Sequence, residues 1–333
     1  MNGILDFGIQ VVVFIQSLGG WLLTPMKLFS LLGTEIFYLL VALALYWCVN
    51  AEAGLRVGLV LMFSGGINDA LKVTLHAPRP YWYSTDVKAL TAESTFGIPS
   101  GHAQHAVVIW SILATWLKRR WAWIAAILLI LFISFSRLYL GVHFPTDVLA
   151  GWLIGIFLVW GLVRFERKFT AWFSRQPVSI QYLAALLASL AILGLGVAVR
   201  LAVGDWQMPP DWKENAARVG GETLSPLDPS GIITNAGAFF GMIVGAIALR
   251  RSGGFEAGKG TGWQMAARYG IGLAGMLILW FGLGQVFPRQ ADFLSYCLRY
   301  LRYTLVGVWF TGLGPLVFIR LGLATQKNKV AGQ

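Results

Sequence analysis

Long apolar segments constrain the fold of this chain more than any other feature of its sequence. They lie near residues 35–50, 55–75, 101–117, 121–141, 146–164, 180–203, 231–249, 268–287 and 303–323. A helix needs about 20 largely apolar residues to cross a bilayer, and lipid admits only helices and closed barrels as spanning structures. Segments this long and this continuously apolar are typical of helices. Residues 8–23 are shorter and contain a glycine pair, so they predict either a further span or an interfacial helix.

The composition agrees with a membrane protein. Hydrophobic residues make up 57% of the 333 residues and charged residues 12%. A soluble domain carries about 25% charged residues, so this chain has too little polar surface to cover a globule in water. The composition excludes a disordered, collagen-like or ordinary cytosolic protein. We predict an all-α fold, a polytopic membrane helical bundle with eight or nine transmembrane helices.

The loops between the predicted spans alternate in charge. One set is basic and includes Lys118, Arg119 and Arg120, then Arg164, Arg167 and Lys168, then Arg250 and Arg251. The long loop 204–230 is instead acidic, with Asp205, Asp211, Glu214 and Asp228. The positive-inside rule places the basic set in the cytoplasm, so loop 76–100 and residues 142–146 open on the extracytoplasmic side. Topology thus explains most of the positive charge, and we predict no nucleic-acid partner.

Several polar residues gather at the predicted helix ends on this extracytoplasmic side. They are Lys72, Arg79, Ser100, His102, Arg137, His143 and Asp147. Ionisable groups in or beside membrane spans are costly unless paired, and by default they mark function. Three cations without a matching number of carboxylates would repel one another, so they predict a ligand with two or more negative charges, such as a phosphoryl group. Gly101 opens a helix directly after Ser100, where free backbone N–H groups favour an anion.

Two histidines complete this group. Asp147 follows His143 by four residues, a spacing that brings the two side chains together on a helix or through a turn at Pro145. A carboxylate on one imidazole nitrogen fixes the tautomer and leaves the other nitrogen free as a nucleophile. His102 can then protonate the leaving oxygen as a general acid. We interpret Asp86, Lys88 and Glu93 as solvated loop residues, and His76 and His105 as rim or packing residues.

These residues fall into three motifs that resemble the type-2 phosphatidic acid phosphatase superfamily, which includes lipid phosphate phosphatases, glucose-6-phosphatase and vanadium haloperoxidases. Residues 72–80 read K-x6-R-P, residues 99–102 read P-S-G-H, and residues 136–147 read S-R-x5-H-x3-D. The resemblance implies a hydrolase with a helical core that uses no metal and no cofactor. It implies that His143 is the nucleophile, Asp147 its orienting partner and His102 the acid and base. The resemblance also assigns phosphate binding to five residues, Lys72, Arg79, Ser100, Gly101 and Arg137.

The sequence then divides into an N-terminal segment (1–30), a catalytic core (30–170) and a C-terminal transmembrane extension (175–333). We predict an integral-membrane phosphatase of the bacterial inner membrane, with its site facing the periplasm. Its partners would be the bilayer and a lipid phosphate monoester or diphosphate, cleaved through a phosphohistidine intermediate. Three alternatives stay open: a sugar-phosphate phosphatase, as the Arg79–Trp82 run suggests, a lipid phosphotransferase, and a non-catalytic transporter or scrambler.

Overall fold

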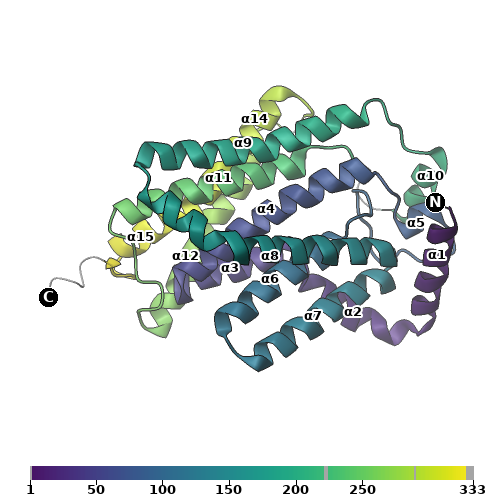
Figure 1. The fold of residues 1–333 in the computed structure, drawn as a ribbon, viewed down its shortest axis with the longest axis horizontal. Coiled ribbons are helices and arrows are strands. Elements are labelled where there is room, and N and C mark those ends of the chain that lie inside the picture. Colours follow the sequence, from purple (N-terminus) through teal and green to yellow (C-terminus); the bar gives the residue numbers. More distant parts are fainter. Residues whose placement is uncertain (1, 221–223, 289, 328–333) are drawn as a thin grey trace. The chain divides into compact units, whose positions relative to one another are not determined.

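The chain is helical throughout the part that the computed structural model describes, which is residues 2–220, 224–288 and 290–327. No strand occurs in these residues, so the predicted all-α class is confirmed (Figure 1). The α-helices are α1 (Asn2–Ser17), α2 (Leu23–Leu31), α3 (Glu35–Ala44), α4 (Ala51–Leu75), α5 (Pro80–Tyr83), α6 (Gly101–Leu117), α7 (Arg120–Tyr139), α8 (Pro145–Arg175), α9 (Val178–Val203), α10 (Pro210–Val219), α11 (Ser230–Arg251), α12 (Gly262–Leu277), α13 (Leu283–Val286), α14 (Phe293–Val308) and α15 (Gly314–Arg320). Wider π-helical turns at Leu45–Val49, Ile278–Gly282 and Trp309–Leu313 continue α3, α12 and α14.

Fewer helices qualify as membrane spans than the eight or nine predicted. In the described residues, six are long and apolar enough: Arg120–Tyr139, Pro145–Arg175, Val178–Val203, Ser230–Arg251, Gly262–Val286 and Phe293–Arg320. Two of the other predicted spans contain site residues. Helix α6 has only 17 residues, and α4, although 25 residues long, carries Asn68, Asp69 and Lys72 near its end. These polar groups lower the hydropathy on which the span count depends.

The N-terminal segment is a bent pair of helices. Gly3–Ser17 and Gly20–Leu31 meet at 88°, and the pair would raise the count of spans to seven if it crosses the membrane as one. Gly19 adopts a φ of +114° at the bend, a conformation that residues with a side chain rarely adopt. The glycine pair noted in the sequence therefore breaks the helix.

The chain divides into two compact units that interleave along the sequence. Unit 1 comprises Met1–Phe37, Ile67–Arg164 and Leu195–Asp228, and unit 2 comprises Tyr38–Gly66, Phe165–Gly194 and Pro229–Gln333. All eight predicted site residues belong to unit 1. So does Leu195–Asp228, which the sequence analysis assigned to the extension.

In unit 1, helices α6 and α8 approach closely at two glycines of α8. A Cβ atom on Gly151 would lie 2.6 Å from the carbonyl oxygen of Ser100, and one on Gly155 would lie 2.8 Å from the Cβ of Val107. Small residues four apart let two membrane helices pack backbone against backbone. This contact brings the first turn of α6 to the first turn of α8, where the site residues lie.

At one end of unit 1, α1, α5 and α10 surround a buried aromatic cluster (Figure 1). Its core includes Tyr81, Trp82 and Phe96. Arg79, a predicted phosphate-binding residue, directly precedes α5. The cluster therefore packs against the backbone that carries Arg79.

In unit 2, α11 and α14 pack closely through glycines. A Cβ on Gly237 would lie 2.6 Å from the carbonyl oxygen of Tyr300, and one on Gly307 would lie 2.5 Å from that of Ala238. The buried Ser189 hydroxyl of α9 lies 2.8 Å from the Ala236 carbonyl and 2.8 Å from the Tyr300 hydroxyl. Backbone contact and polar bonds between helices replace the hydrophobic effect, which lipid does not supply.

Candidate active site

The first motif runs from the end of α4 to the start of α5. Lys72 lies in the last turn of α4, and Arg79 is the N-cap residue of α5. Pro80 occupies the first turn of α5, where a missing N–H costs nothing, and it holds Arg79 in an extended conformation. The two cations thus lie at the ends of two helices joined by a short turn.

A dense set of hydrogen bonds fixes the Arg79 side chain, which is fully buried. Its guanidinium donates to the carbonyl oxygens of Thr95 at 2.6 Å, Val142 at 3.0 Å and Phe96 at 3.1 Å. The Thr95 hydroxyl lies 3.1 Å from Arg79 Nη2 and 3.0 Å from Lys72 Nζ. Thr95, which the motifs do not include, therefore ties the two cations together.

The second motif opens α6. Ser100 is the N-cap residue, and its backbone N–H donates to the carbonyl of Asp147 at 3.0 Å. The Ser100 hydroxyl is buried and has no hydrogen-bond partner among the described residues, so it can donate to a ligand oxygen. A Cβ on Gly101 would come within 3.2 Å of the Asn68 side chain, which explains the need for glycine. His102 follows in the first turn of α6.

The third motif joins α7 to α8 through a short loop. His143 Nδ1 lies 3.1 Å from Asp147 Oδ2, and the same oxygen accepts the backbone N–H of Phe144 at 2.9 Å. Because a carboxylate only accepts hydrogen bonds, we assign the imidazole proton to Nδ1. His143 Nε2 then keeps its lone pair, and it lies 3.3 Å from Arg79 Nη1.

His143 is buried, and its surroundings keep it neutral. Burial lowers the pKa of the imidazole well below its usual value, and the charges of Arg79, Arg137 and Lys72 lower it further. A neutral imidazole with a free nitrogen beside a fixed cation is suited to nucleophilic attack on an anionic ester.

Arg137, in the last turn of α7, has two partners from distant parts of unit 1. Its Nη1 donates to the Ser30 hydroxyl at 2.5 Å, and its Nη2 forms an ion pair with Glu93. Its Nε is buried without a partner among the described residues. Ser30 comes from the N-terminal bent pair, so that segment also contributes to the site.

Glu93 was expected to be a solvated loop residue, and this interpretation is wrong. Its carboxylate pairs with Arg137 and lies 3.9 Å from Arg79 Nη2. Burial alone would raise the pKa of Glu93, but Arg79 and Arg137 outweigh it and hold this pKa well below its usual value. The Glu93 carboxylate therefore lies among the predicted phosphate-binding cations. A lone Glu in a loop gives no sequence signal of such a contact.

The other two histidines lie beside the site. His105 Nε2 lies 3.3 Å from a Glu35 carboxylate oxygen. His76 adopts a φ of +31°, and its ring packs 5.4 Å from that of Trp206. His105 thus pairs with a carboxylate and His76 packs against an aromatic ring, as expected of rim or packing residues.

Residues 195–228 support the loop that carries Glu93 and Thr95. The Trp206 ring packs edge-on against Phe96 at 5.3 Å, and the Asn215 side chain donates to the Trp82 carbonyl at 3.0 Å. The Ser225 N–H donates to the Ser94 carbonyl at 3.3 Å. Since the Phe96 carbonyl holds Arg79, this segment positions the cation indirectly.

The site thus combines fixed cations, orphaned donors and a neutral imidazole oriented by a carboxylate. Such a set can bind a phosphoryl group and attack its phosphorus. The contact between Arg79 and His143 connects the first motif to the third. The hydrogen bond from the Ser100 N–H to the Asp147 carbonyl connects the second motif to the third.

Comparisons with known proteins agree with this geometry. The PAP2 superfamily profile matches residues 53–171, and a profile for the PAP2 superfamily phosphatase transmembrane extension matches residues 233–326. Phosphatidylglycerophosphatase B of Bacillus subtilis is 29% identical over 161 residues, which cover 44% of this chain and 77% of that protein. Glucose-6-phosphatase catalytic subunit 1 of Felis catus is 23% identical over 369 residues, which cover 98% of this chain and 99% of that protein.

One solved structure is also similar. It is the crystal structure of a transmembrane PAP2-type phosphatidylglycerolphosphate phosphatase from Bacillus subtilis, with 27% sequence identity and a TM-score of 0.43. The match covers 50% of this chain and 88% of that chain.

Proposed function

Since this chain belongs to the PAP2 superfamily and is an integral-membrane phosphatase, we propose that it hydrolyses a phosphate ester of a membrane lipid through a phosphohistidine intermediate, without a metal ion. The observation that carries the proposal is the orientation of His143. Asp147 holds Nδ1, so Nε2 is unprotonated and accepts from Arg79 Nη1 at 3.3 Å, and it can attack once Arg79 turns to a phosphoryl oxygen.

The reaction takes place in two steps. In the first, His143 Nε2 attacks the phosphorus, the bond from phosphorus to the ester oxygen breaks, and His102 gives its proton to the leaving alkoxide. In the second, His102 takes a proton from water as the water attacks the phosphohistidine, which releases phosphate and restores His143. Asp147 stabilises the positive charge on the imidazole in both steps.

The cations and donors stabilise the charge on the transferring group. Lys72, Arg79 and Arg137 face the equatorial oxygens, and the Ser100 hydroxyl and Gly101 N–H donate to them. Loss of one well-aimed donor costs about 100- to 1000-fold in turnover. The Glu93 carboxylate leaves the cations when a phosphoryl group binds, because two anions cannot share them.

An apolar groove beside the motifs supports a lipid substrate. It has a volume of about 490 Å³ and lies between α7 and α8, lined by residues that include Leu131, Phe135, Leu138 and Trp152. Two of the residues that line the groove, Leu138 and Val148, directly follow the site residues Arg137 and Asp147 in the chain. A hydrocarbon chain in this groove would bring its head group to the cations.

The relatives favour two substrate classes. The names of several concern lipid phosphates, including phosphatidylglycerophosphatase B and the lipid A 4'-phosphatase of Bacteroides thetaiotaomicron. The alignment with a glucose-6-phosphatase, however, covers 98% of this chain, whereas those with the two lipid phosphatases cover 44% and 23% of it. A soluble sugar phosphate is therefore the second candidate substrate.

The test is phosphate release by detergent-purified protein from a panel of phosphatidate, phosphatidylglycerol phosphate, polyprenyl diphosphate and glucose 6-phosphate, with EDTA present. We expect release from a lipid ester, none above background for His143→Ala, and an acid-labile phosphoprotein in the wild type. Strict dependence on a metal, or appreciable turnover by the folded His143→Ala variant, would overturn the mechanism. Release from glucose 6-phosphate alone would favour the second candidate, and a new phospholipid without inorganic phosphate would show transfer.

The same proposal places the protein in a bacterial inner membrane with this site at the periplasmic face. It rests on the basic loops, which the positive-inside rule assigns to the cytoplasm.

A further inference from the structure

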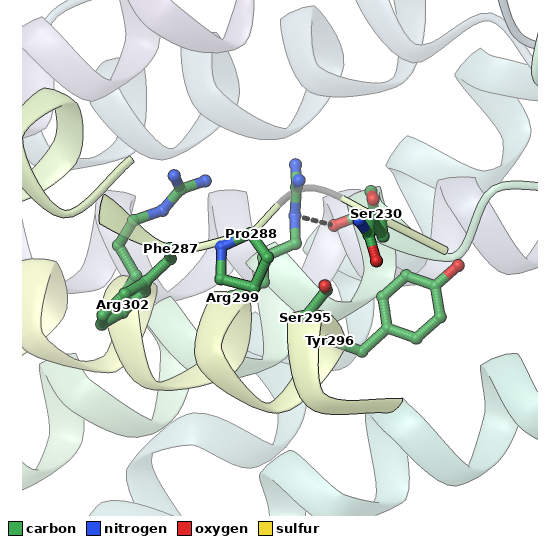
Figure 2. Close-up of a pocket in the computed structure, with 8 residues that line it drawn as sticks. Ser230, Phe287, Pro288, Ser295, Tyr296, Arg299 and Arg302 are labelled. Carbon is green, nitrogen blue, oxygen red and sulfur yellow. Dashed lines mark hydrogen bonds between the residues drawn. The ribbon is translucent and has the colours of Figure 1, made fainter. Parts of the chain in front are cut away.

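A second cluster of cations lies in unit 2, whose residues contain none of the proposed catalytic groups. Ser295, Arg299 and Arg302 follow one another at spacings of four and three along α14, so they share one face of that helix. With Ser230, Phe287 and Pro288 they line a small cavity, drawn in Figure 2.

Arg302 is the group in this cavity that requires an explanation. Its side chain is 9% exposed, and its Nε is buried without a hydrogen-bond partner. Its guanidinium carbon lies 4.9 Å from the centroid of the Tyr303 ring, and the ion pairs recorded among the described residues do not include it. An aromatic face attracts a cation but supplies no hydrogen-bond acceptor in the plane of the guanidinium.

No carboxylate of unit 2 is in a position to neutralise Arg302. Glu166 pairs with Arg56, Glu256 lies 4.0 Å from Lys259, and Glu52 lies in the first turn of α4. Asp292 caps α14 by accepting from the backbone and side chain of Ser295, ten residues or about 15 Å of helix before Arg302.

The position of Arg302 in the sequence adds to the cost of leaving its charge without a partner. It lies within the apolar stretch Phe293–Arg320, where a charged side chain is costly and by default marks a functional site. Helical side chains point toward the N-terminus, so the guanidinium extends back toward Phe287 and Pro288, which line the same cavity. Figure 2 shows the Arg299 and Arg302 guanidinium groups extending to the same side of α14.

We propose that the cavity formed by Arg302, Arg299, Ser295 and Ser230 is an anion-binding site that takes a phosphate oxyanion, separate from the catalytic site. The cavity has a volume of about 30 Å³, which is room for two or three water molecules. The oxygens of one phosphate group replace those waters. Arg302 offers its planar fork, including the buried Nε that has no partner among the described residues.

The phosphate can belong to an anionic lipid head group or be inorganic phosphate, and the test separates the two. Full-length protein in a neutral detergent is titrated with dihexanoyl phosphatidylglycerol, dihexanoyl phosphatidylcholine or inorganic phosphate, and the Tm is recorded. At about one hundred times the Kd we expect phosphatidylglycerol to raise the wild-type Tm by about 5 °C. Phosphatidylcholine, with the same tails and no net charge, should leave it unchanged. If inorganic phosphate is the ligand, only inorganic phosphate should raise the Tm. Phosphate that binds at the catalytic site is separated with Arg137→Gln: the Tm shift that remains in this variant should be lost when Arg302→Gln is added.

Three variants decide whether Arg302 is responsible. Arg302→Gln should lose the shift and Arg302→Lys should keep part of it. Gln290→Glu places a carboxylate at the rim of the cavity, on an exposed residue, and should also lose the shift without a change in the core. Basal phosphatase activity should stay within about twofold of wild type in all three. The proposal is overturned if neither probe shifts the wild type, or if Arg302→Gln or Gln290→Glu responds as the wild type does.

Discussion

At the scale of single residues, the carboxylate of Glu93 is the counter-ion of two arginines of the candidate site. It pairs with Arg137 and lies 3.9 Å from Arg79, where the proposed substrate would place its phosphoryl oxygens. We expect Glu93→Gln to lower the free energy of unfolding by about 1.5–3 kcal/mol, because the charged hydrogen bond to Arg137 is weakened and the ion pair with Arg79 is lost. Inorganic phosphate should then raise the Tm of the variant more than that of the wild type, since no carboxylate competes with it.

Asp86→Asn is the matched control, because Asp86 lies in the same loop but is exposed. Thermal unfolding with and without phosphate checks the prediction. If Glu93→Gln and Asp86→Asn behave alike, Glu93 does not neutralise the site.

The neutral state of His143 predicts how stability depends on pH. The pKa of His143 is lower in the folded protein than in the unfolded chain, where it is about 6.5. The unfolded chain therefore takes up the proton first, and the free energy of unfolding should decrease as the pH falls below about 6.5, by up to about 1.4 kcal/mol per pH unit. Above that pH, His143 adds no slope.

His143→Gln keeps a donor for Asp147 but does not titrate. The difference in unfolding free energy between wild type and this variant should shrink from about pH 8 to about pH 5, because groups such as Glu93 titrate in both proteins and cancel. Denaturant unfolding at several pH values measures it. Parallel profiles for the two proteins would show that His143 is not kept neutral.

The structure brings several of the predicted site residues together, and it also shows contacts that the sequence did not predict. Spacing within the motifs indicated which side chains belong together, because each motif marks a helix end. Glu93, Thr95 and Ser30 were missed, since their contacts come from a loop and a bent helix pair whose paths no local pattern encodes.

At the scale of elements, the close contact between α6 and α8 holds the second motif against the third. Gly151 faces the carbonyl of Ser100, whose N–H in turn bonds to Asp147. Gly151→Ala should push the two helix starts apart, cost about 1–3 kcal/mol of stability and reduce kcat/KM by about 100-fold, because a shift of about 1 Å misaligns the reacting groups.

Gly161→Ala provides the control on the same helix, since nothing lies within 4 Å of a Cβ at Gly161. Steady-state kinetics and Tm of both variants give the answer. Equal activity in the two variants would mean that the helix contact does not position the site.

Helix boundaries were largely predictable because the apolar segments are long. The predicted spans 180–203 and 231–249 correspond to Val178–Val203 and Ser230–Arg251. The span count was too high because α6 and Glu35–Val49 are too short to qualify, and α4 carries polar residues near its end. The role of residues 195–228 was not predictable, since it depends on tertiary contacts of Trp206 and Asn215 with a loop far away in sequence.

At the scale of the whole molecule, the distribution of charge predicts how the chain lies across the membrane. In a variant without Cys48 and Cys297, a single cysteine at Glu214 should react with a membrane-impermeant maleimide in intact cells. A cysteine at Arg119 should react only after the cells are opened, because its loop is basic and expected in the cytoplasm. Both positions are exposed, so accessibility alone cannot explain a difference. The reverse pattern would place the proposed site on the cytoplasmic side.

The division into a catalytic core and an extension stays a prediction, although the two compact units show how interwoven the chain is. Unit 1 takes three separate stretches of sequence, and its last stretch begins within α9, the first span of the predicted extension. The extension therefore cannot be removed at residue 175 without loss of the loop support that Leu195–Asp228 gives.

The built-in carboxylate at Glu93 also bears on how the protein is made. A nascent chain entering the bilayer meets no substrate, yet its arginines find a counter-ion within the same polypeptide as soon as the loop closes. We therefore expect the site to fold without a bound phosphate ester, and a chain that lacks this residue to insert with two buried arginines that have lost their shared counter-ion.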